Sequence, residues 1–94
     1  GPSSNDYYAA GRYYKDSGKD YNKALEMINK SIEMRGEEKF WMVRQKALTL
    51  AKLGKTEEAI MAAEKSIALA KIAGNDDYVK SNEKSIAEWK SMKK

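Results

Sequence analysis

Glycines divide this chain at nearly regular intervals, at Gly18, Gly36, Gly54 and Gly74. The only proline is Pro2, so no proline interrupts the segments between these glycines. Glycine commonly follows the last turn of a helix, because it can adopt the left-handed backbone conformation without a steric penalty. The spacing therefore predicts helices of about 15 residues joined by tight loops.

The apolar residues within each segment recur every three or four positions, which is the period of a helix and not of a strand. In the fourth segment, for example, Ala59, Ala63 and Ile67 fall on one face. Side chains able to accept hydrogen bonds from free helical N–H groups stand at three of the segment starts, at Asp20, Thr56 and Asn75 or Asp76. We predict five helices, over residues 5–17, 20–35, 38–53, 56–73 and 76–92.

Composition narrows the function. The 94 residues are enough for one modest core, so we expect a single domain. The chain has no Cys and no His, which argues against disulfides, the common metal sites and most nucleophile or acid–base chemistry. We therefore expect no enzyme, no metal and no cofactor. The net charge of +4 is spread among interspersed charges of both signs, so we expect no nucleic-acid partner. No apolar run is long enough for a membrane span, so we expect none.

The chain also repeats itself. Residues 24–34 (ALEMINKSIEM) align with residues 59–69 (AIMAAEKSIAL) at an offset of 35, and both contain Lys-Ser-Ile. A period of about 34 residues is typical of helical-hairpin repeats. The preceding segments agree at an offset of 36, which places Tyr7, Gly11, Tyr14 and Gly18 over Val43, Ala47, Leu50 and Gly54.

The stretch KALTLAKLGKTEEAIMAAEKSIAL resembles the tetratricopeptide repeat, and GRYYKDSGKDYNKALEMINKSIEM resembles a second copy. The resemblance implies an all-α fold of tandem antiparallel helical hairpins, stacked as an α-solenoid of about two repeats plus a C-terminal capping helix, over residues 5–94. The proline that usually closes each repeat is missing, so we expect the fourth helix to run long.

Two further similarities concern the origin of the chain. Residues 1–4 (GPSS) resemble the remnant of an expression tag. The stretches FWMVRQKALTLAKLG and AGNDDYVKSNEKSIAEW are similar to the C-terminal repeat region of uncharacterised cell-envelope proteins from Bacteroidetes bacteria. That similarity implies the tail of a longer protein and leaves both the cell envelope and the cytoplasm open as compartments.

In this repeat family the first helix of each pair lines a concave surface that is the usual peptide groove. Arginine can hold a carboxylate with two parallel hydrogen bonds, and Trp and Tyr offer flat contact area, so such a wall suits an acidic or C-terminal segment. The alternative is that Tyr8 and Trp41 pack between the repeats and that the cations are merely solvated. The helical period places eight residues on that side: Tyr8, Arg12, Lys15, Trp41, Arg44, Gln45, Leu48 and Lys52.

The leading hypothesis is a non-enzymatic protein–protein interaction module that binds a peptide, acidic by the charge of the groove. The alternative is a structural or self-associating fragment of a longer repeat protein with no ligand of its own. The last helix has a polar outer side that fits a cap, whereas nothing comparable precedes Tyr7. We therefore expect as partner another protein or peptide, or a second copy of the chain through an uncapped end.

Overall fold

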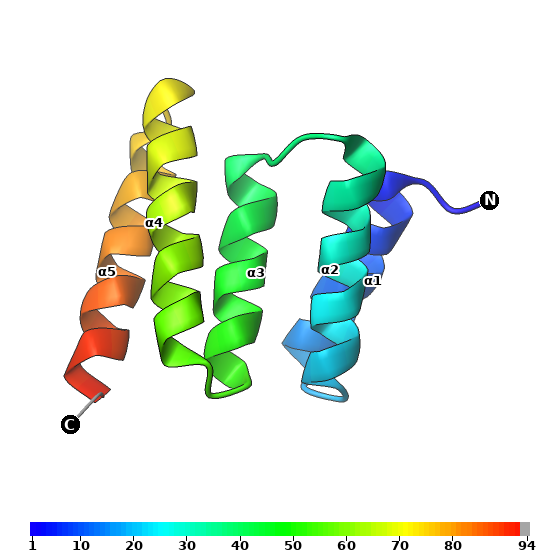
Figure 1. Cartoon of the computed structure of the whole chain (residues 1–94), viewed down its shortest axis with the longest axis horizontal. Coiled ribbons are helices and arrows are strands. Elements are labelled where there is room, and N and C mark those ends of the chain that lie inside the picture. Colours follow the sequence, from blue (N-terminus) through cyan, green and yellow to red (C-terminus); the bar gives the residue numbers. More distant parts are fainter. Residues whose placement is uncertain (93–94) are drawn as a thin grey trace.

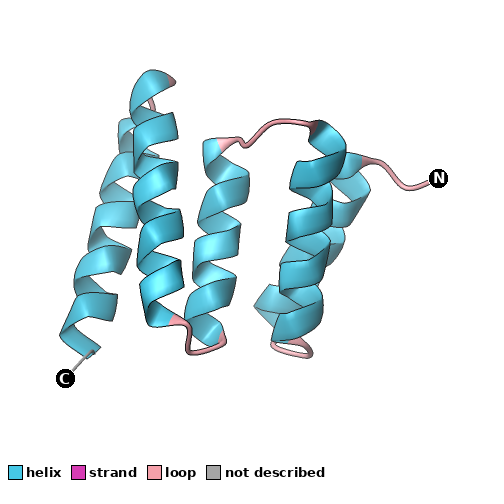
Figure 2. Cartoon of the chain, in the orientation of Figure 1, coloured by secondary structure: helices cyan, strands magenta, loops and turns pink. Residues whose placement is uncertain are grey.

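The computed structural model describes residues 1–92 and contains five helices and no strand in that range (Figures 1 and 2). Each boundary lies within two residues of the predicted one, which confirms the helical prediction. The fourth helix has 17 residues against 15 in the second, as expected for a helix with no closing proline. The helices are α1 (Ser4–Ser17), α2 (Tyr21–Arg35), α3 (Phe40–Lys52), α4 (Thr56–Ile72) and α5 (Asp76–Met92).

The helix ends follow from local sequence. All four dividing glycines have φ between +70° and +81°, so each one turns the chain in the left-handed conformation. Asp20 Oδ1 accepts a hydrogen bond from the Lys23 N–H at 2.9 Å, and Asn75 Oδ1 accepts one from the Tyr78 N–H at 3.0 Å. The prediction of Thr56 as a cap is wrong, because Thr56 is already the first residue of α4 and that helix has no side-chain cap.

The five helices pack in sequence order as adjacent antiparallel pairs. Figure 1 shows α1 behind α2 and α5 behind α4, with α3 between the two pairs. Helix α3 contacts all four of the others, so it is the centre of the molecule. The result is a flat slab of about 42 × 31 × 17 Å. Within residues 1–92, every helix is too short or too polar to cross a bilayer.

Small residues form the closest helix contacts. Ala47, Ala59 and Ala63 have no exposed surface and cluster with Leu50 and Trp89, so the core lies among α3, α4 and α5. Short side chains let the helix backbones approach, and Trp89 fills the volume that they leave. Ala24, which aligns with Ala59 in the repeated stretches, likewise has no exposed surface.

Gly11 plays the same part between α1 and α2. A Cβ atom at this position would lie 2.6 Å from Ile28 Cγ1 and 3.2 Å from the Ala24 carbonyl oxygen. The first distance is too short for a real Cβ contact, so Ile28 would have to shift, and the second requires the α2 backbone to give by a few tenths of an ångström. Gly11 therefore marks a close approach of α1 to α2.

Gly11→Ala should lower the free energy of unfolding by about 1–3 kcal/mol through overpacking. In an open helix the same change would be stabilising by about 1 kcal/mol, because alanine has the better helix propensity. Urea denaturation followed by circular dichroism measures the difference. Ala9→Gly, at an exposed position of the same helix, is the matched control and should cost about 0.5–1 kcal/mol. Unfolding of Gly11→Ala at a higher urea concentration than the unmodified chain would contradict the close contact.

Candidate functional site

The two aromatic residues of the predicted groove meet across the junction of the helix pairs. The ring of Tyr8 on α1 lies 4.9 Å from that of Trp41 on α3, edge to face at 82°, and Arg35 stands 5.4 Å from the centre of the Trp41 ring. Both aromatic residues are half-buried. Burial raises the pKa of the Tyr8 hydroxyl, and the Arg12 charge acts in the opposite direction. This contact agrees with the packing alternative for the two rings, yet leaves part of each accessible.

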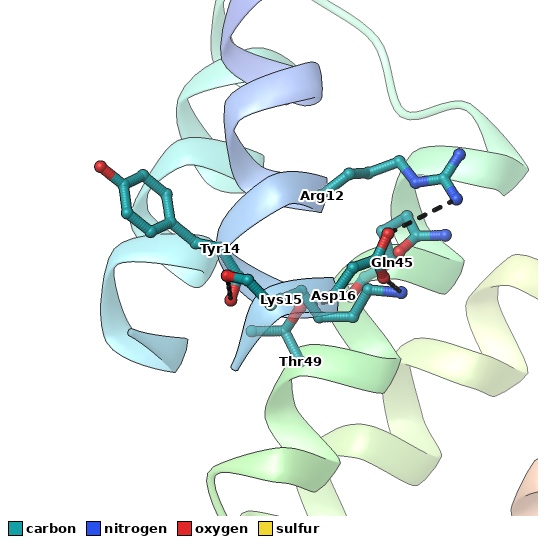
Figure 3. Close-up of polar contacts among 7 residues, drawn as sticks. Arg12, Tyr14, Lys15, Asp16, Gln45 and Thr49 are labelled. Carbon is teal, nitrogen blue, oxygen red and sulfur yellow. Dashed lines mark hydrogen bonds and ion pairs between the residues drawn. The ribbon is translucent and has the colours of Figure 1, made fainter. Parts of the chain in front are cut away.

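The two cations that α1 contributes share one carboxylate. Lys15 Nζ lies 2.7 Å from Asp16 Oδ1, and Arg12 Nη2 lies 3.9 Å from Asp16 Oδ2 (Figure 3). The hydrogen bond from Lys15 is the main cause that lowers the pKa of Asp16, so the carboxylate is ionised at neutral pH. Asp16 follows Arg12 by four positions, a spacing that places both on one side of a helix. Asp16 was not among the predicted residues of this face, and its carboxylate partly neutralises the predicted basic wall.

Arg44 has a different environment. Its Nη1 donates hydrogen bonds to Asn82 Oδ1 at 3.0 Å and to Ser85 Oγ at 3.3 Å, both on α5. Both acceptors are neutral, and no carboxylate within residues 1–92 forms a recorded ion pair with this guanidinium. Burial lowers the pKa of Arg44, whereas Tyr78 acts to raise it. A partly desolvated cation thus faces the surface without a counter-ion.

The orientation of Arg44 is set by a chain of buried hydrogen bonds. Asn82 has no exposed surface, and its Nδ2 donates to Ser66 Oγ at 2.9 Å and to the Tyr78 carbonyl oxygen at 2.9 Å. Ser66 Oγ in turn donates to the Phe40 carbonyl oxygen at 2.7 Å. With every polar group of Asn82 engaged, its Oδ1 is fixed to accept from Arg44. Three helices, α3, α4 and α5, hold this one guanidinium.

Two nitrogens of the guanidinium, Nε and Nη2, form no hydrogen bond with the part of the chain that the structure describes. Arginine carries five N–H donors, and the hydrogen bonds recorded within residues 1–92 use Nη1 alone. The N–H groups of Nε and Nη2 form the planar fork that matches the two oxygens of a carboxylate. Arg44 can therefore bind an acidic group without releasing its contacts to α5.

Leu48 and Lys52 lie further along α3, at a separate hollow of about 400 Å³ between α3 and α5. Lys15 reaches the same hollow from α1. The structure therefore divides the predicted groove residues into one group around Trp41 and Arg44, nearer the start of α3, and a second group around Leu48, nearer its end. The remaining walls of the hollow include Ala51, Thr56, Ser85, Glu88, Trp89 and Met92.

Gln45 lies inside the molecule. Only 7% of its surface is exposed, and Figure 3 shows it on α3 beside Arg12 and Asp16 of α1. Its Oε1 is buried and has no hydrogen-bond partner within residues 1–92. The buried Thr49 Oγ1 donates a hydrogen bond to the backbone carbonyl oxygen of Gln45 at 2.8 Å, and not to its side-chain Oε1. An unused acceptor of this kind lowers stability unless something else fills it.

Sequence reasoning missed three polar residues of this face, Asp16, Asn82 and Ser85. The helical period places Asn82 on one stripe with Ile86 and Trp89, which predicts its burial but not its hydrogen bonds. The signal that could have found it is a single amide on an otherwise apolar stripe, because a buried amide needs partners. Asp16 was detectable from its spacing to Arg12.

Comparisons with known proteins yield no matching family model, no matching curated protein and no matching solved structure.

Gln45→Met should raise the free energy of unfolding by about 1 kcal/mol, because it removes an unsatisfied buried acceptor and keeps the volume. The contrasting variant is Asn82→Leu, which should lower it by about 2–3 kcal/mol because Arg44 and Ser66 lose a bonded partner. Denaturant titration measures both. Equal destabilisation by the two changes would mean that Oε1 of Gln45 has a partner in solution.

Proposed function

We propose that this chain is a non-enzymatic protein-interaction module that binds an acidic peptide segment across α1, α3 and α5. The observation that carries the proposal is the free fork of Arg44, which is partly desolvated and held by neutral acceptors. Water has already been removed from part of this cation, and α5 has already fixed its rotamer. An incoming carboxylate would therefore gain a charge-assisted hydrogen bond at a low cost in ordering.

The surrounding residues support the same ligand class. The rings of Tyr8 and Trp41 contact each other and keep accessible surface, and Arg12 adds a second cation that remains half exposed. Aromatic and arginine side chains are the residue types that most often dominate binding energy at interfaces. The affinity should be weak, on the order of micromolar to hundreds of micromolar, since the face is short and wet.

The repeat architecture belongs to the same proposal. We assign α1–α2 and α3–α4 to two tetratricopeptide-like hairpins, and α5 to a capping helix that completes the face. Four features support the assignment: the offset of 35 between the aligned stretches, the left-handed glycines, the close approach at Gly11 and the alanine core. In such a solenoid each pair buries its apolar face on its neighbours, and the first helices share one surface.

Arg44→Gln should weaken binding of a blocked heptapeptide with a central Glu by about tenfold, because the charge-assisted fork is lost. Isothermal titration calorimetry measures the affinity, and circular dichroism checks that the helices persist. Lys84→Gln, which removes a charge from an exposed position of α5, is the matched control and should change the affinity less than about twofold. A peptide with Gln in place of Glu that bound equally well would refute an acidic ligand.

Asp16→Asn should act in the opposite direction and tighten binding of the same Glu peptide by about two- to fivefold. The change releases Arg12 and Lys15 from their shared carboxylate and removes a repulsive charge from the face. Raising the salt concentration should shrink this gain, since Asp16 is exposed and its interactions are screened. An unchanged affinity would place the bound peptide away from α1.

A further inference from the structure

We infer that the hollow between α3 and α5 holds an apolar side chain of the same peptide, two residues away from the acidic group that Arg44 binds. The inference rests on the proposed function and adds a second subsite to it. It commits the ligand to an extended segment of the form acidic–any–apolar. Leu48 and Trp89 are the side chains that we assign to this subsite.

The chemistry of the hollow suits an aliphatic side chain. Its volume is about 400 Å³, and Leu48, Ala51, Trp89 and Met92 contribute its apolar walls. Trp89 is 8% exposed, so it is anchored in the core and presents a fixed surface. An open hollow with a rigid apolar wall gains free energy when a methyl-bearing side chain displaces its water.

Ser85 is a neighbour of both the hollow and Arg44. Ser85 accepts a hydrogen bond from Arg44 Nη1 at 3.3 Å, and the same residue lines the hollow. On α3 the step from Arg44 to Leu48 is one helical turn, and on α5 the step from Ser85 to Trp89 is also one turn. The two subsites therefore follow each other along both helices.

This spacing selects the register of the ligand. Residues one helical turn apart are separated by about 5.4–6 Å along the helix axis, and we take this as the separation of the two subsites. In an extended peptide, side chains two positions apart lie on the same side and are separated by about 6.6–6.8 Å. Side chains of adjacent residues in an extended peptide point to opposite sides, so they cannot enter both subsites. Side chains four residues apart are too far from each other to reach both. An acidic residue followed or preceded at two positions by an aliphatic residue fits both subsites at once.

The charge of Lys52 on α3 favours a peptide of acidic character at this rim. Lys15 also borders the hollow, but its charge is paired with Asp16, and Glu88 adds a carboxylate from α5. Lys52 is exposed and forms no recorded ion pair within residues 1–92. Basic flanks on the ligand would be repelled from this rim, and acidic flanks would be attracted.

Three blocked heptapeptides test the inference on the whole chain by calorimetry. They carry Glu-Ala-Leu, Glu-Ala-Ala or Glu-Leu-Ala between the same Gly and Ser flanks, so the first and third have identical composition. Glu-Ala-Leu should bind about tenfold more tightly than Glu-Ala-Ala, from the burial of one aliphatic side chain. Glu-Leu-Ala should stay within about twofold of Glu-Ala-Ala, because its leucine points away from the hollow.

A second readout locates the leucine. The chain has two tryptophans, Trp41 and Trp89. Both peptides carry the same glutamate for the Arg44 part of the face, so a change in tryptophan fluorescence that Glu-Ala-Leu causes beyond that of Glu-Ala-Ala reports Trp89. We expect this additional change. Ala51→Met narrows the hollow and should reduce the gain from leucine to less than about threefold. Ala87→Met, at an exposed position of α5, is the matched control and should keep the full gain.

The outcomes separate the two proposals. If all three peptides bind with equal affinity, the hollow subsite is refuted and the acidic peptide site stands. If Glu-Leu-Ala matches Glu-Ala-Leu, the spacing is refuted. If none of the three binds, the proposed function falls and takes the subsite with it. If the Trp89 fluorescence depends on protein concentration without peptide, a second copy of the chain covers the hollow, and the inference is overturned.

Discussion

The side chain of Asn82 is the interaction on which this face depends. It has no exposed surface, and it links the Arg44 guanidinium, the Ser66 hydroxyl and the Tyr78 carbonyl oxygen. A buried amide is costly unless all of its donors and acceptors are bonded, so only one arrangement of α3, α4 and α5 satisfies it. Alanine contacts bring these helices close, but apolar packing alone tolerates sliding. The amide fixes their register and, through it, the direction of Arg44.

The first helix pair is joined to the rest more loosely. Its contacts with α3 run mainly through α2, and α1 adds the ring contact of Tyr8 with Trp41. Oε1 of Gln45, which has no hydrogen-bond partner within residues 1–92, lies at this junction. Exposed ion pairs such as Arg12 with Asp16 contribute little to the free energy of folding. The angle between the pairs is therefore less strongly determined than the packing of α3, α4 and α5. A ligand that touches both Arg12 and Arg44 would add the missing constraint.

Helix positions and much of the core were predictable, because they depend on local signals. Each of these signals depends on residues only a few positions apart. They are the spacing of the glycines, the caps at Asp20 and Asn75, and the helical period of buried residues such as Ala59 and Ala63. The candidate site was predictable only in part. The period of α3 placed Arg44 and Leu48 on one face, but their partners on α5 lie about 40 residues away in the chain. Pairing over that separation depends on tertiary packing, which no local pattern encodes.

The contrast between Arg44 and the α1 cations decides which charge can select a ligand. Arg12 and Lys15 share a carboxylate in an exposed position, so an acidic peptide must compete with Asp16 for them and gains little from either. Arg44 has neutral partners, and its burial lowers its pKa without a compensating anion. The cost of desolvating this cation is met by the folding of α3 and α5, before any ligand arrives. The guanidinium is thus held ready for the anion that we propose it binds, and in that proposal the apolar hollow one turn away would turn a general attraction into a preference for a particular spacing.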